Sequence, residues 1–119
     1  MGGPVLLIKI EWADLILSKE KTMEVRGSDC KHIGTRVFLG VSREGGKVAG
    51  YCVFGSTIPI KTVEEFRALE NEHRVVLGEG EDLPYPTRTF GWRIKSVVKY
   101  FIPQSWNQPR GPIVWSKVQ

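Results

Sequence analysis

The chain has 119 residues, of which 41% are hydrophobic, 10% aromatic and 25% charged. This composition is typical of one compact domain spanning residues 1–119, and it excludes the disordered class, which is poor in hydrophobic residues. Seventeen Lys and Arg residues against thirteen Asp and Glu residues give a formal net charge of +4, which favours a polyanionic partner without requiring one.

The cysteines and the N-terminal apolar run bear on cofactors and compartment. Cys30 and Cys52 form no C-x-x-C pair and have no histidine at zinc-finger spacing, so they indicate neither a metal site nor a disulfide framework. The run from Val5 to Leu7 is too short for a signal peptide or a membrane span, and Lys9 follows it closely. We expect a soluble, monomeric, intracellular protein, cytoplasmic or nuclear, with no cofactor, metal or membrane partner.

Hydrophobic spacing predicts the first two elements. Val5 to Ile10 is a β-branched and leucine-rich run that follows two glycines, which is typical of a buried strand. A helix is predicted from about Glu11 to Ser18, because Trp12, Leu15 and Ile16 recur at helical spacing.

The stretch from Ser18 to Arg26 carries an unusual density of charge. From Thr22 onward the pattern alternates, so apolar residues face one side of a predicted strand while Thr22, Glu24 and Arg26 face the other. Lys21 lies at the joint between helix and strand, where its long side chain can reach either face. We therefore expect an ammonium, a carboxylate and a guanidinium to converge on one small patch.

The middle of the chain is predicted to form a β-hairpin. Thr35 to Val41 alternates as a third strand, and the Gly-Gly pair within Arg43 to Lys47 is a turn signal before a fourth strand from Val48 to Ile58. These two strands should be antiparallel. Pro59 is expected to end the fourth strand.

A helix and a long loop should follow. Thr62 is a plausible N-cap with Glu65 three residues later, and an apolar stripe predicts a helix from about Thr62 to Glu70. Glycines, prolines and acidic residues from Asn71 to Thr87 predict an excursion outside the sheet, with a short helical turn around His73.

The last third of the chain returns to strand-like patterns. Phe90 to Ile94 and Lys95 to Phe101 are aromatic and β-branched, Gly91 is a candidate kink or bulge, and Pro103 is expected to end this segment. Ile113 to Val118 should form a final strand. Five or six short strands with helices favour a small barrel with helical caps, since closure removes sheet edges.

Four segments together resemble one known family. They are Lys21-x-x-Glu24-x-Arg26 after a short helix, Phe66 to His73, Phe90-Gly91-Trp92, and Pro109 to Trp115. In this combination, which spans most of the chain, they resemble the activating-signal-cointegrator homology (ASCH) domain. The hallmark of that family is G-x-K-x-x-E-x-R. Here Lys19 stands at the glycine position, a departure that concerns only the local turn.

The resemblance implies a fold and a function. The fold would be α+β, a mixed β-barrel like that of pseudouridine-synthase-and-archaeosine-transglycosylase (PUA) domains, with five or six strands and two or three short helices. Such domains have a cleft that is usually proposed to bind RNA or modified nucleosides. The expected partner is therefore RNA, a nucleotide or a nucleoside.

Three residues of the motif are the leading binding candidates. Arg26 could bind a phosphate or a base edge through two hydrogen bonds. Glu24 could hold the Arg26 guanidinium in place or accept a hydrogen bond from a base amino group. Lys21 could serve as a point charge for a phosphate, or as a base if burial lowered its pKa. The plainer interpretation is a solvated Glu24–Arg26 pair and a lysine favoured by the end of a helix.

Further candidates lie outside the motif. His73 could bind a ligand or take part in catalysis, although a lone histidine is more often a packing residue. Trp12, at the start of the first helix, or Tyr85, in the long loop, could offer a ring face on which a base stacks. Aromatic residues of this kind are otherwise core or rim residues.

A hydrolase acting on a modified nucleoside or on RNA is the alternative. In the bacterial acetylcytidine amidohydrolase branch of the family, the position that matches Glu24 looks like a threonine, which acts with the lysine at Lys21 and a glutamate near Glu70 or Glu72. Thr22, on the same predicted strand face, is the candidate substitute for that hydroxyl, because a carboxylate cannot copy a threonine alkoxide. We therefore predict a binding module. A protein-interaction module in transcription or translation has no dedicated signal.

Overall fold

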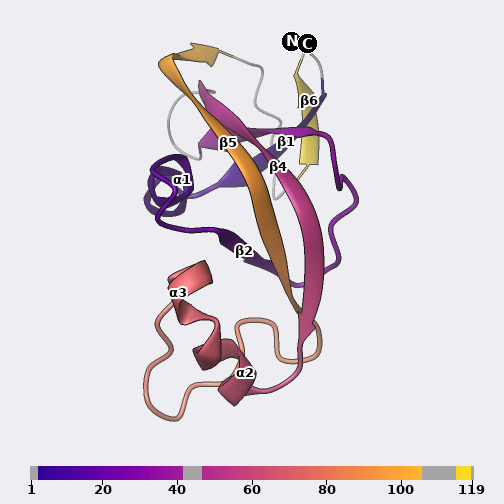
Figure 1. The fold of residues 1–119 in the computed structure, drawn as a ribbon, viewed down its shortest axis with the longest axis vertical. Coiled ribbons are helices and arrows are strands. Elements are labelled where there is room, and N and C mark those ends of the chain that lie inside the picture. The colour runs from indigo at the N-terminus through magenta and orange to yellow at the C-terminus, as the bar shows by residue number, and fades with distance from the viewer. Residues whose placement is uncertain (1–2, 42–46, 106–114, 119) are drawn as a thin grey trace.

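A curled mixed sheet dominates the computed structural model, which describes residues 3–41, 47–105 and 115–118. Its strands are β1 (Gly3–Ile8), β2 (Met23–Arg26), β3 (Arg36–Val41), β4 (Lys47–Ile60), β5 (Thr89–Ser105) and β6 (Trp115–Val118). They are ordered β2-β5-β4-β3-β1-β6, and all neighbours are antiparallel except β1 and β3. The long strands β4 and β5 run side by side along the molecule (Figure 1).

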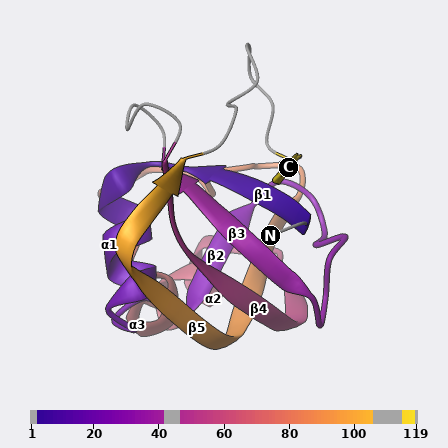
Figure 2. The same ribbon diagram turned by 90° about the horizontal axis from the view of Figure 1, so that it is seen from above.

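Figure 2 shows the strands curling around a common centre, with α1 (Ile10–Leu17) against one side. In the described part of the chain the terminal strands of the sheet, β2 and β6, do not pair with each other, so the sheet is a half-barrel. The small α+β fold with a mixed sheet is confirmed. None of the helices within the described ranges is long and apolar enough to cross a membrane.

The helix predicted from Thr62 to Glu70 is present but divided. It consists of α2 (Val63–Ala68) and α3 (Glu70–His73), with Leu69 as the joint between them. Thr62 caps α2 by accepting a hydrogen bond from the main-chain nitrogen of Glu65 at 3.0 Å, and the Glu65 carboxylate accepts from the main-chain nitrogen of Lys61 at 2.9 Å. These reciprocal bonds satisfy N–H groups that a helix start leaves unpaired.

Two core clusters position the site. The first lies between α1 and the sheet, where Ile16 and Leu39 are buried and Phe54 meets Trp92 edge-on, with ring centroids 5.4 Å apart. The second includes Phe66 of α2 and consists of Met23, Val25, Ile60, Phe66, Leu77 and Leu83. β2 joins the two regions, because it leads from the end of α1 into the second cluster.

Three expected interruptions of strands are wrong. Pro59 lies inside β4, opposite Phe90, in a part of the strand that pairs with β5 alone, where a missing N–H is tolerated. β5 continues past Pro103 to Ser105, with a register shift on the way. The expected kink at Gly91 is also absent, since that residue pairs in register with both neighbours and the nearby irregularities fall at Gly55 and Lys95.

Two sequence features lie partly or wholly outside the described residues. The Gly-Gly turn between β3 and β4 is one of them, although the strands that it joins are antiparallel as predicted. The other is the start of the final strand at residues 113–114, together with residues 109–114 of the C-terminal motif.

Candidate ligand-binding cavity

A cavity of about 410 Å³ opens between the end of β1, α1, β2 and the loop that follows α3. Trp12 from α1 and Tyr85 from the loop are part of its walls, and both are partly exposed. Lys21, Glu24 and Arg26 also line it. The structure therefore brings together five of the residues that the sequence singled out.

The alternation of β2 explains how the charged side chains reach the cavity. Met23 and Val25 belong to the second core cluster, whereas Glu24 and Arg26 form an ion pair beside the cavity. Met23 can pack closely on β5 because Gly91, opposite Val25, has no side chain; an added Cβ there would lie 2.5 Å from the Met23 sulfur. The predicted shared orientation of Glu24 and Arg26 is thus present in the fold.

Glu24 and Arg26 interact through one carboxylate oxygen. Arg26 Nε donates to Glu24 Oε2 at 2.8 Å, and Arg26 Nη2 lies 2.7 Å from the same oxygen. Arg26 Nη2 also donates to the main-chain oxygen of Leu7 at 3.1 Å, which ties the guanidinium to β1. Within the described residues, Glu24 Oε1 accepts no hydrogen bond and Arg26 Nη1 has no acceptor. One acceptor and one donor group thus remain available.

Lys21 is buried, with 1% of its surface exposed, although it carries an amine. Its Nζ donates to the main-chain oxygen of His73, lies 3.8 Å from Glu24 Oε1 and is 4.8 Å from the centre of the Trp12 ring. Burial lowers the pKa of Lys21 from its ordinary 10.5 to about 8, with the nearby Glu24 opposing this shift and Arg26 adding to it. The amine is held by a carbonyl, a carboxylate and an aromatic face.

The His73 side chain is a packing residue in this arrangement. Its Nδ1 accepts from the main-chain nitrogen of Val75 at 2.9 Å, which leaves the proton on Nε2, 2.7 Å from the Phe66 oxygen. The ring stacks on that of Phe66 with centroids 3.9 Å apart, and burial lowers the pKa of His73. The imidazole does not line the cavity, and His73 contributes its carbonyl oxygen to Lys21 instead.

The remaining catalytic candidates lie outside the cavity lining. Thr22 is exposed and lines a second depression, which Lys21 also lines. Glu72 forms an exposed ion pair with Arg93 at 3.1 Å, and Glu70 is half-buried on α3. The residues that line the cavity within the described ranges include no serine, threonine or cysteine.

Lys19 occupies the position where the ASCH hallmark has glycine. Its φ is 70°, in the left-handed region that glycine adopts without steric cost. The main-chain nitrogen of Lys19 donates to the Ile16 oxygen at 3.0 Å and closes the turn after α1. The turn therefore has the geometry that suits glycine, and a lysine adopts it here at some cost in strain.

Sequence reasoning missed the main-chain part of the site. The carbonyl oxygens of Leu7 and His73 hold the two cations, and Val75 and Pro84 complete the lining on the side of the loop. Carbonyl groups belong to every residue type, so no pattern of side chains could have identified them.

No family model matches the sequence, and no curated protein matches it either. Solved structures do match. The crystal structure of a serine-to-alanine variant of an ASCH protein from Zymomonas mobilis has a TM-score of 0.74 and 14% identity, covering 98% of this chain and 87% of that chain. A tyrosine-to-phenylalanine variant gives 0.67 and 14%, covering 98% and 89%. The structure described as ASCH from the same organism gives 0.62 and 16%, covering 78% and 66%. The expected ASCH-type fold is confirmed.

Proposed function

We propose that this ASCH-type fold is a binding module for RNA or a nucleotide, and that it holds one base in the cavity beside Lys21, Glu24 and Arg26. One observation carries the proposal. Buried charges are costly unless they are fully paired, yet Glu24 Oε1 and Arg26 Nη1 have no hydrogen-bond partner among the described residues. A polar ligand would complete this set.

The chemistry of the unused groups suits the edge of a nucleobase. Glu24 Oε1 can accept a hydrogen bond from an amino or ring N–H group, while Arg26 Nη1 and Lys21 Nζ can donate to a carbonyl oxygen or ring nitrogen. Bases present such donors and acceptors side by side. Trp12 and Tyr85 supply aromatic surface for stacking, and a volume of about 410 Å³ falls within the range of small-ligand sites.

A hydrolase is a second candidate because of the lowered pKa of Lys21. With a pKa of about 8, Lys21 is partly neutral near that pH and could accept a proton from a water molecule. Water would have to be the nucleophile, because the described lining residues carry no aliphatic hydroxyl or thiol. Binding without catalysis needs no such group and remains the leading proposal.

Fluorescence anisotropy with short labelled single-stranded RNAs tests the proposal through Tyr85. Loss of a stacked ring costs about 1–3 kcal/mol, so Tyr85→Ala should weaken binding at least about fivefold, whereas Tyr85→Phe should bind as the wild type does. Phe101→Ala is the matched control, since Phe101 is a fully exposed aromatic residue outside the cavity. Unchanged binding by both Tyr85→Ala and Trp12→Ala would refute binding in this cavity.

A separate incubation with acetylated cytidine distinguishes the two candidates. We expect little or no acetate to be released, because Glu24 stands where the related hydrolases carry a hydroxyl. Chromatography of the product identifies the reaction. Robust release of acetate by the wild type, lost in Lys21→Ala, would favour the hydrolase instead.

A further inference from the structure

A second depression of about 300 Å³ lies between the end of α1, the start of β2 and the middle of β5. Its polar lining consists of Lys19, Lys21, Thr22, Lys95 and Ser96. Lys21 lines both this depression and the cavity beside Glu24 and Arg26 (the base cavity), so the two hollows share one lining residue.

The lining is cationic and lacks carboxylates. Three of the described lining residues are lysines and two carry hydroxyl groups, whereas none is Asp or Glu. Three acidic side chains lie near these positions: Glu20 accepts from Ser18 Oγ at 2.8 Å, Glu72 pairs with Arg93 at 3.1 Å, and Glu24 lies 3.8 Å from Lys21 Nζ. An anion in the depression would therefore meet the positive charges of Lys19 and Lys95, whereas Glu24 already offsets that of Lys21 at 3.8 Å.

The end of α1 does not oppose an anion strongly. A helix C-terminus normally presents unpaired carbonyl oxygens, which carry partial negative charge. Here the main-chain nitrogens of Ser18, Lys19 and Lys21 donate to the oxygens of Asp14, Ile16 and Leu15, at 3.0, 3.0 and 2.9 Å. These three carbonyl oxygens at the end of α1 are thus already occupied.

Backbone irregularities place the two outer lysines. Lys19 lies in the left-handed turn after α1, with φ 70°. Lys95 is the extra residue of a β-bulge, since Ser96 pairs with Val53 and Ile94 pairs with the adjacent Phe54. Bulges commonly redirect a side chain beside a functional site. The stem of Lys95 passes over Gly55, where an added Cβ would lie 3.2 Å from the Lys95 Cβ.

We infer that this depression is a phosphate-binding site, so that the ligand of the protein carries a phosphate next to the base that it buries. The inference rests on the proposed function and makes it more specific. Ammonium groups and hydroxyls match the several acceptor oxygens of a phosphate. In a nucleotide one sugar links the base to the phosphate, so the two groups lie close together. The two hollows also lie close together, because Lys21 lines both. A free nucleoside would leave the second hollow unfilled.

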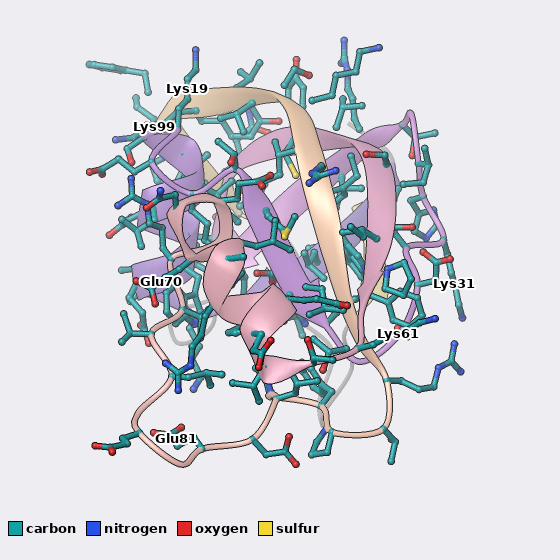
Figure 3. All side chains as sticks on the ribbon, turned by 60° about the horizontal axis from the view of Figure 1, so that its bottom comes forward. Lys19, Lys31, Lys61, Glu70, Glu81 and Lys99 are labelled. Carbon is teal, nitrogen blue, oxygen red and sulfur yellow. The ribbon has the colours of Figure 1, made fainter. Side chains whose placement is uncertain are left out.

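Removal of the two outer lysines tests the inference. The double variant Lys19→Gly/Lys95→Gln lowers the charge by two while giving the left-handed turn the residue that suits it. The control is Lys31→Gln/Lys61→Gln, which changes the net charge equally at positions on the opposite side of the molecule from Lys19 (Figure 3). The ligands are the four ribonucleosides, their 5′- and 3′-monophosphates, and a short single-stranded RNA.

The phosphorylated ligands should bind the double variant about fivefold more weakly, while nucleoside affinity stays the same. The slope of log affinity against log salt should become shallower by about 0.7 for one lost phosphate contact. An effect on monophosphates and RNA alike indicates a terminal phosphate, and an effect on RNA alone indicates a phosphodiester. Equal losses for nucleosides, or equal losses in the control variant, would overturn the inference.

A direct titration separates failure of this inference from failure of the proposed function. If neither nucleosides nor RNA bind the wild type, the base cavity is refuted while the phosphate site is still tested by inorganic phosphate. Amide chemical shifts of Thr22, Lys95 and Ser96 should then move in the wild type and stay unchanged in the double variant. No movement in the wild type would overturn the phosphate site as well.

Discussion

Replacing Arg26 by methionine should destabilise the fold far more than an ordinary surface change. Arg26 places two nitrogens at 2.7 and 2.8 Å from Glu24 Oε2, and the side chains of Arg26 and Glu24 are only 17% and 6% exposed. Removing one partner of a buried pair leaves the other charge uncompensated, which typically costs about 3–5 kcal/mol. Lys21, 3.8 Å from the other carboxylate oxygen, offsets part of this cost. We expect a loss of about 3 kcal/mol.

Such a loss is a large share of the roughly 5–15 kcal/mol that stabilise a typical domain. Urea denaturation at pH 7, followed by far-UV circular dichroism, measures it for the wild type, Arg26→Met, Glu24→Gln and the double variant. The double variant should be more stable than Arg26→Met alone, because the unpaired carboxylate is gone. A loss below about 1 kcal/mol for Arg26→Met, or a double variant no better than that single one, would refute the role given to this pair.

Three other predictions concern stability and are measured in the same way. The folded pKa of Lys21, about 8, lies below its ordinary 10.5, so the unfolded chain binds more protons between these values. The free energy of unfolding should therefore rise with pH from about 8 to 10.5, by up to about 3 kcal/mol, and Lys21→Met should lack this rise. Lys19→Gly should stabilise the protein by about 0.5–1 kcal/mol by relieving the left-handed φ of 70°, and a destabilised variant would contradict that account. Thr62→Ala should cost about 1 kcal/mol, because it removes the cap on α2, whereas Thr62→Ser should cost much less.

Local periodicity predicted the elements that form the charged part of the site. The helical spacing of Trp12 and Ile16 and the alternation around Glu24 reflect direct physical requirements, since each element must bury one face. Those requirements hold wherever the element packs, so α1 and β2 could be derived without the rest of the fold. The ion pair of Glu24 and Arg26 follows from the same alternation, as next-but-one residues on one strand.

Features set by distant neighbours could not be predicted in this way. Pro59 and Pro103 do not interrupt their strands. A proline disrupts a strand only where a neighbouring strand would have accepted a hydrogen bond from the missing N–H, and the local sequence does not show where that is. The burial of Lys21 depends on the carbonyl of a residue 52 positions away, which no local pattern encodes. His73 could have been a ligand or a packing residue on sequence grounds, and the hydrogen bonds that engage both of its ring nitrogens could not be read from the sequence.

The bonds between α3 and the two residues before β2 make the segment after β4 part of the cavity itself. Thr22 donates its main-chain N–H to the Glu72 oxygen at 2.8 Å, one residue from the carbonyl that holds Lys21. Helices as short as α2 and α3 are not stable in isolation, so their order comes from docking. Undocking would hydrate Lys21 and free the Thr22 amide together, as one subglobal opening. The hydrogen-exchange rate of that one amide therefore reports how often the cavity comes apart, and a bound ligand that needs the cavity intact should slow it.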